Sequence, residues 1–88
     1  MPYIKREQRF GLDDKVDSLA SHISSFSVEE QDGMINYTIT KLLKKIYPRK
    51  YFHYNRAIGV LECVQQEFYR RQVSPYEDEK IKENGDVQ

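Results

Sequence analysis

Residues 55–87 read NRAIGVLECVQQEFYRRQVSPYEDEKIKENGDV, and this stretch decides the fold. Its apolar residues recur every three to four positions, which is the period of an amphipathic helix. The stretch therefore predicts a long helix over residues 55–73 that opens at or just before Asn55. The residues of its apolar face are Tyr54, Ala57, Leu61, Val64 and Phe68.

The tetrapeptide Ser74-Pro75-Tyr76-Glu77 predicts the start of a second, short helix over residues 75–83. Serine is a favoured N-cap, proline suits the first helical position, and the glutamate at the third completes a capping box. The following Asn84-Gly85 predicts the end of this helix, because glycine closes many helices. The pattern thus predicts a stop and a restart near Ser74.

Two more helices are expected upstream of a short aromatic linker, PRKYFHYN (48–55). The first spans residues 12–25. The second has its firm part at residues 34–47, begins either at a Ser27 capping box or after Asp32, and ends at Pro48, because the residue before proline is pushed out of the helical region. Residues 1–10 are expected to form an N-terminal arm. The two apolar stripes are Leu12, Val16, Leu19 and Ile23, then Ile35, Ile39, Leu42 and Ile46.

The composition limits how much core the chain can build. It has 88 residues, of which 39% are hydrophobic, which allows one domain over residues 1–88 with a marginal core. Chains of this size often gain stability from a partner chain. The expected fold is all-α: a small helical hairpin or three-helix domain with a short C-terminal fourth helix, assembled as a homo-oligomer. A monomeric three-helix domain is the alternative.

The zero net charge hides an asymmetry along the chain. Residues 1–40 carry four basic and seven acidic residues, residues 41–71 carry eight and two, and residues 72–88 carry two and five. The middle segment therefore attracts anions. The simpler interpretation is a solvated basic face balanced by acidic ends.

Catalytic and metal-binding patterns are missing from the sequence. His22 and His53 do not share a metal-ligand spacing, Cys63 has no second cysteine, and the glycines are scattered rather than gathered in a phosphate-binding loop. We expect no metal, no cofactor and no enzymatic activity. A single cysteine and the lack of an apolar leader or membrane span predict a cytoplasmic protein.

A polar line accompanies the long helix, with Asn55, Glu62 and Tyr69 two turns apart. Gly59 removes side-chain bulk beside it and permits close approach of a helix or a ligand. One interpretation is a helix–helix contact between subunits. The other is a ligand site, in which arginines bind phosphate and tyrosines stack on a base. The candidate ligand-binding residues are Asn55, Arg56, Glu62, Tyr69, Arg70, Arg71, Tyr37 and Tyr76.

Three blocks carry a resemblance: MPYIKRE (1–7), NYTITKLL (36–43) and, most specifically, residues 55–87. Through them the chain resembles a family of short, uncharacterised bacteriophage and prophage proteins. The resemblance implies a phage-type origin, a small helical fold and a location inside a bacterial host cell. It transfers no reaction and no site.

Small helical phage proteins of this size include signal sponges, which are homo-oligomers that sequester cyclic nucleotides or cyclic ADP-ribose derivatives made by bacterial immune systems. By this fold-level analogy we expect a non-enzymatic anti-defence protein that binds such a signal at subunit interfaces. A protein-interaction module that inhibits a host protein is the alternative, with residues 75–88 as its docking surface. Nucleic-acid binding by residues 41–71 is less favoured, because the acidic ends of the chain repel a polyanion.

Overall fold

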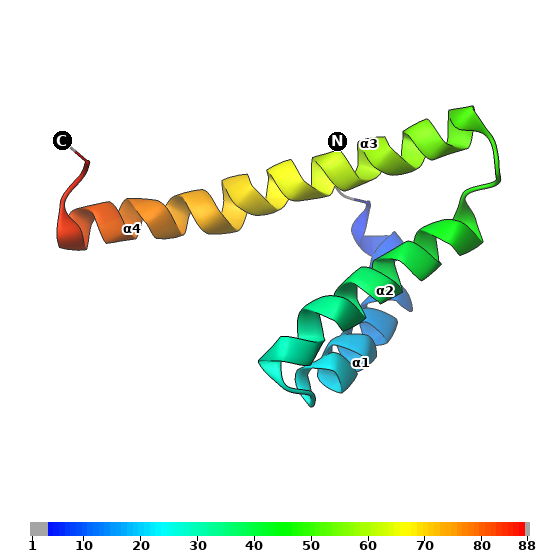
Figure 1. Ribbon diagram of the computed structural model, residues 1–88, viewed down its shortest axis with the longest axis horizontal. Coiled ribbons are helices and arrows are strands. Elements are labelled where there is room, and N and C mark those ends of the chain that lie inside the picture. Colours follow the sequence, from blue (N-terminus) through cyan, green and yellow to red (C-terminus); the bar gives the residue numbers. More distant parts are fainter. Residues whose placement is uncertain (1–3, 88) are drawn as a thin grey trace. The chain divides into compact units, whose positions relative to one another are not determined.

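The computed structural model describes residues 4–87, and every regular element in this part of the chain is helical (Figure 1). The all-α prediction is therefore confirmed. The chain divides into two units, residues 4–50 and residues 51–87. We call the first the N-terminal hairpin and the helical part of the second, residues 51–84, the C-terminal run. The prediction of one domain over residues 1–88 stays a prediction.

The N-terminal hairpin opens with a short 3-10 helix, η1 (Arg6–Arg9), where the sequence predicted only an arm. The first three residues of that predicted arm lie outside the described part. Gly11 then turns the chain with a φ of 80°, a conformation that glycine adopts without strain. It leads directly into α1 (Leu12–Ser24), which ends one residue before the predicted boundary.

Helix α2 (Val28–Ile46) begins earlier than its predicted firm part. Of the two predicted starts, the one at Ser27 is correct, since the Ser27 carbonyl accepts hydrogen bonds from the backbone N–H groups of Glu30 and Gln31 at 3.0 and 3.1 Å. The Ser27 side chain makes no capping bond. Gly33 does not interrupt the helix. A glycine inside a helix costs only about 1 kcal/mol relative to alanine, and a helix of 19 residues tolerates this cost.

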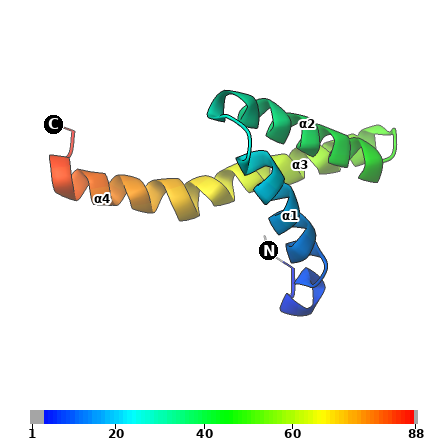
Figure 2. The ribbon, with the colours of Figure 1, turned by 90° about the horizontal axis from the view of Figure 1, so that it is seen from below.

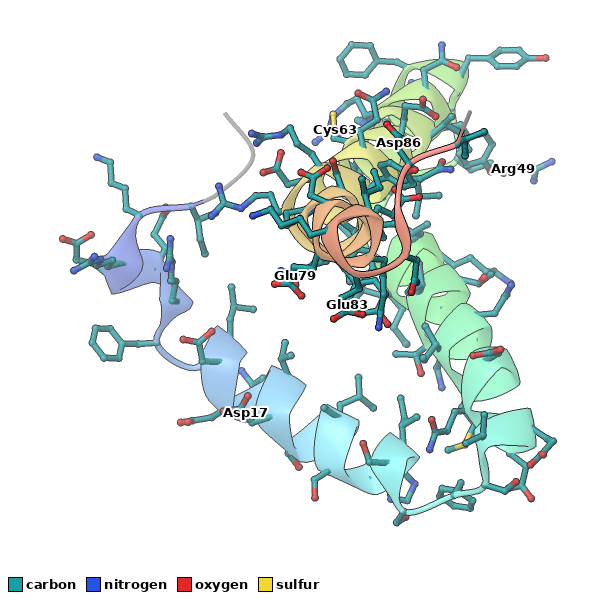
Figure 3. The ribbon with its side chains drawn as sticks, turned by 90° about the vertical axis from the view of Figure 1, so that its left-hand side faces the viewer. Asp17, Arg49, Cys63, Glu79, Glu83 and Asp86 are labelled. Carbon is teal, nitrogen blue, oxygen red and sulfur yellow. The ribbon has the colours of Figure 1, made fainter. Side chains whose placement is uncertain are left out.

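The two helices of the hairpin form a V that opens away from the turn joining them (Figures 2 and 3). An open V covers little apolar surface. Leu19 and Ile39 each keep 40% of their surface exposed, and Ile23 is half-buried. The stripes that the sequence predicted are present on both helices, but the hairpin by itself does not bury them.

Helix α3 (Tyr51–Phe68) starts four residues before the predicted position at Asn55. The predicted linker is thus mostly helical, and only the turn at residues 47–50 is irregular, with the Lys50 N–H donating to the Pro48 carbonyl at 2.9 Å. Side-chain contacts stabilise the first turn of α3. The Arg56 guanidinium lies 2.9 Å from His53 Nδ1 and 6.0 Å from the centre of the Phe52 ring.

The predicted stop and restart near Ser74 are wrong. Helix α3 passes without a break through a π-helical segment, η2 (Tyr69–Val73), into α4 (Ser74–Asn84), as Figure 1 shows. Val73 and Ser74 both have α-helical backbone angles, and no side-chain cap forms. The predicted end is confirmed, because Gly85 has a φ of 86° and its N–H donates to the Ile81 carbonyl at 2.8 Å.

Pro75 explains why the run widens instead of breaking. In an α-helix a proline donates no hydrogen bond, and its ring clashes with the carbonyl four residues earlier, here that of Arg71. A π-turn is wider and bonds across five residues. The Ser74 N–H accordingly donates to the Tyr69 carbonyl. The helix absorbs the proline by taking one extra residue into the turn.

Candidate functional site

The polar line predicted on the long helix lies on the C-terminal run. Asn55 and Glu62 belong to α3, and Tyr69 is the first residue of η2. All three are exposed. Gln66, one turn after Glu62, donates from Nε2 to Glu62 Oε1 at 3.0 Å. The line is therefore a solvent-facing row of hydrogen-bonding groups.

Beyond Tyr69 the polar line continues to Glu77. The Tyr69 hydroxyl donates to Glu77 Oε1 at 2.8 Å. In a regular α-helix, residues eight apart are rotated by about 80°. The extra residue taken up by η2 removes part of that rotation, so that Tyr69 and Glu77 meet. The π-segment thus decides which acidic residue joins the line.

The contact with Glu77 changes the chemistry of the Tyr69 phenol. The hydrogen bond to Glu77 holds the proton, and the carboxylate charge also opposes formation of a phenolate, so the pKa of Tyr69 lies above its ordinary value. Tyr69 consequently acts as a hydrogen-bond donor at neutral pH and is poorly suited to serve as a base.

The two adjacent arginines share one carboxylate. Arg70 Nη2 lies 2.6 Å from Glu67 Oε1, and Arg71 Nε lies 3.9 Å from the same oxygen. The Glu67 side chain is only 18% exposed, whereas those of Arg70 and Arg71 are 67% and 55% exposed. This arrangement fixes both arginines at one point of the run and offsets part of their charge.

The other candidate residues lie apart from this cluster. Arg56 is engaged with His53 and Phe52 at the start of α3. Tyr76, in α4, has the Lys80 ammonium 5.4 Å from its ring centre. Seven of the eight predicted residues thus lie on the C-terminal run, spread along its length.

The eighth candidate residue, Tyr37, belongs to α2 of the N-terminal hairpin. Its ring has the Lys41 ammonium 5.7 Å from the centre. It also lines an open groove of about 530 Å³ between α1 and α2, and Gly33 leaves room at the groove wall. The remaining lining residues are Leu19, His22, Ile23, Glu29, Glu30, Met34 and Thr38.

Two residues of the observed site were missed from the sequence, Glu67 and Glu77. The contacts of Glu67 could have been predicted from the sequence. Residues three and four positions apart on a helix are neighbours, and Arg70 and Arg71 follow Glu67 at those spacings. The contact of Glu77 could not, because a contact eight residues away depends on the π-turn. The sequence instead assigned Glu77 to a capping box.

The described residues were compared with the patterns of metal sites and of membrane-spanning helices. Among residues 4–87, no three histidine, cysteine or acidic side chains are grouped so that they can hold a metal ion. None of the helices in this range is long and apolar enough to span a bilayer. Cys63 is exposed on α3, on a different side of the C-terminal run from Glu79 and Glu83 (Figure 3).

A family model, described as a domain of unknown function (DUF6899), matches residues 1–87. The chain belongs to this family. Comparisons with curated proteins and with solved structures find no match. The match covers nearly the full length of the chain and includes both the N-terminal hairpin and the C-terminal run.

Proposed function

We propose that this DUF6899 member is a non-enzymatic binding protein that works as a homo-oligomer. The observation that carries the proposal is the exposure of its apolar residues, since Ala57 is the only apolar residue among the described ones that is buried. A protein that leaves its helical stripes in water is expected to cover them with another chain.

The size of the exposed surface supports this proposal. The chain exposes 8429 Å², whereas a compact protein of 10.5 kDa exposes about 5,400 Å². Two separately compact halves expose about 6,500 Å² together, so each unit taken by itself leaves more surface in water than a compact unit of its size. The excess of about 1,900 Å² per chain is larger than the roughly 800 Å² that each partner buries in a stable protein interface of standard size.

The subunit number tests the proposal directly. Native mass spectrometry of protein purified gently from phage-infected cells reports the number of subunits and any retained small molecule in one spectrum. Light scattering over a range of concentrations reports the same number in solution. We expect a defined oligomer. A monomer at every concentration contradicts self-association.

For the ligand, we propose a nucleotide-derived immune signal of the cyclic oligonucleotide or cyclic ADP-ribose type, held at subunit interfaces. The support is the guanidinium pair Arg70–Arg71, fixed by Glu67 next to the Tyr69 phenol. Guanidinium groups bind phosphate through paired N–H donors, and exposed tyrosine rings stack on bases. The phage-type origin and the bacterial cytoplasm belong to this same proposal.

A thermal-shift panel tests the ligand. Cyclic dinucleotides and cyclic ADP-ribose derivatives are added in excess, and a true ligand raises Tm by mass action. Replacing Arg70 and Arg71 with glutamine is expected to abolish the shift. The matched control removes two exposed basic residues outside α2, Arg6 and Lys15, and is expected to retain it. An oligomer with no shift for any compound contradicts the ligand while leaving self-association intact.

The second candidate function is inhibition of a host protein, which the character of α4 favours. This helix is exposed and acidic, and Glu79 and Glu83 project from the same side of it (Figure 3). Reversing both charges is expected to abolish capture of a host enzyme from lysate, with Asp17→Lys on α1 as the control. If the double reversal leaves capture unchanged, α4 is not the docking surface.

A further inference from the structure

The outward face of α2 carries a regular apolar line. Ile35, Ile39, Leu42 and Ile46 follow one another at spacings of four, three and four residues, which is the a/d pattern of a coiled coil. Their exposed fractions lie between 40% and 61%. We call these four residues the α2 seam. Apolar residues at this spacing are typical of a helix that packs against a second helix, and here they are exposed to water.

Helix α1 does not supply that facing helix. The side chains of α2 that border the groove beside α1 include Met34 and Thr38, which are half-buried. Successive residues on an α-helix point about 100° apart, so Ile35 and Ile39, each following one of these two, point to a different face. Helix α1 therefore leaves the α2 seam exposed.

The charges of α2 are separated along its length. Its first turns carry only acidic charges, at Glu29, Glu30 and Asp32, and its last turns only basic ones, at Lys41, Lys44 and Lys45. The exposed turn that follows adds Arg49 and Lys50. A second copy running parallel places like charges together. A second copy running antiparallel places each acidic end against a basic end.

We propose that two copies of the chain pack their α2 helices antiparallel about a two-fold axis between Thr40 and Lys41. This inference rests on the proposed self-association and names the surface that forms it. In this register Ile35 of one copy faces Ile46 of the other, and Ile39 faces Leu42. Each contact occurs twice, as an isologous interface requires.

The same register also matches the charges at both ends. Asp32 continues the seam by one step before Ile35, and it falls opposite the turn of Arg49 and Lys50 in the other copy. Figure 3 shows the Arg49 side chain extending outward from the chain. Within one chain, Asp32 and this turn stand at opposite ends of α2, at least about 20 Å apart along its axis. Attraction between them therefore operates between copies.

Charge reversal on the full-length chain tests this pairing. We expect Asp32→Arg to weaken self-association about tenfold, because two attractive contacts per dimer become repulsive. Reversing the turn with Arg49→Glu and Lys50→Glu is expected to have a similar effect. Combining all three changes restores opposite charges and is expected to restore the wild-type Kd. Sedimentation equilibrium measures each constant.

Two controls separate the seam from other surfaces. Glu29→Arg makes the same charge change in the first turn of α2 but lies off the seam, and it is expected to raise the Kd much less than Asp32→Arg does. Leu42→Asp on the seam is expected to weaken association by about 100-fold. Val64→Asp on α3 changes a residue of similar exposure, 58% against 54%, and is expected to have little effect.

The outcomes are distinguishable. Loss in the two charge variants with recovery in the combination supports the antiparallel seam. If the wild type associates but the combination does not recover, or only Val64→Asp dissociates it, the seam is overturned and the proposed homo-oligomer stands. A wild-type monomer at all concentrations overturns both, and the seam is then covered within the chain or by a different protein. Circular dichroism confirms that each variant is folded.

Discussion

In the N-terminal hairpin two helices flank a groove that is lined partly by apolar side chains, whereas in the C-terminal run the side-chain contacts join residues of one continuous helix. The ion pairs of the described residues all lie in the C-terminal run, where Glu67 holds Arg70 and Arg71, and Lys80 contacts Glu83 at 3.0 Å. Each such local pair adds only about 0.2–0.5 kcal/mol. Taken alone, the hairpin leaves its apolar stripes exposed, whereas the run is stabilised largely by contacts along its own helix.

The difference suggests a division of labour. Apolar lines with heptad spacing favour a subunit contact on the hairpin. The polar line from Asn55 to Glu77, with its arginines and tyrosines, favours recognition on the run. This division requires the run to be one continuous helix whose contacts join residues close in sequence. Both properties can be tested by substitution.

The largest effect is expected from Pro75→Ala. Proline inside a helix costs up to about 3 kcal/mol relative to alanine, so the variant should stabilise the run by about 1–3 kcal/mol and allow η2 to become α-helical. Thermal melting followed by circular dichroism measures the change. A shift below about 0.5 kcal/mol would indicate that Pro75 sits in the first turn of a separate helix, where it is tolerated.

Ser74→Ala is the matched test of the same point. If Ser74 were the N-cap of a new helix, losing its hydroxyl would cost about 1 kcal/mol. Its backbone is α-helical and no side-chain cap is formed at this junction. We therefore expect no loss of stability. A loss of the capping size contradicts the continuous run.

The next effect compares a glycine in each unit. Gly33 in α2 and Gly59 in α3 both have open space where a Cβ would stand. Alanine at either position should stabilise its helix by up to about 1 kcal/mol. Neither glycine lies on the α2 seam, so neither variant should weaken self-association. If Gly59→Ala alone dissociates the oligomer, a helix packs closely on α3 and the subunit contact belongs to the C-terminal run.

The sequence predicted the fold wherever the signal was periodic. The stripes of α1 and α2, the end at Gly85 and the polar line on α3 all follow from the helical period or from the backbone freedom of glycine. The start of α3 was missed because Tyr51 to Tyr54 are weak helix formers and looked like a linker. Contacts of Arg56 with His53 and Phe52 support that turn. Helix propensities of single residues do not include such side-chain contacts.

The failure at Ser74 has a different origin. Serine, proline and glutamate at these spacings satisfy a capping box, and the same residues also fit a widened turn inside a continuous helix. Local propensity does not distinguish the two, because the choice depends on the whole run from Tyr51 to Asn84. The contact of Tyr69 with Glu77 was lost from the predicted site for the same reason.

A smaller effect is expected from Glu67→Gln. It removes the negative charge that contacts Arg70 and Arg71. Because both arginines are exposed, the loss of these two ion pairs should lower the free energy of unfolding by less than about 1 kcal/mol. The loss should shrink at high salt, which screens such pairs. Glu83→Gln, which removes one pair, is the control. If the arginines bind phosphate, Glu67→Gln should also weaken binding of any ligand found in the thermal-shift panel, because it releases the two guanidinium groups from the carboxylate that positions them; stronger binding would mean that the charge of Glu67 opposes the phosphate.

The smallest effect concerns pH and is confined to the contact between Tyr69 and Glu77. The pKa of Tyr69 is raised in the folded protein by its hydrogen bond to Glu77 and by the charge of that carboxylate. A raised folded pKa favours the protonated phenol, so the contribution to stability is complete below about pH 10, the ordinary tyrosine value, and is lost as pH rises through the higher folded value. Denaturation midpoints of the wild type should therefore fall more steeply above this pH than those of Tyr69→Phe. In Glu77→Gln the charge is gone while an oxygen acceptor stays, so the wild-type slope should be partly reduced. Identical slopes in all three proteins would show that the contact is not maintained in solution, and the polar line would then end at Tyr69.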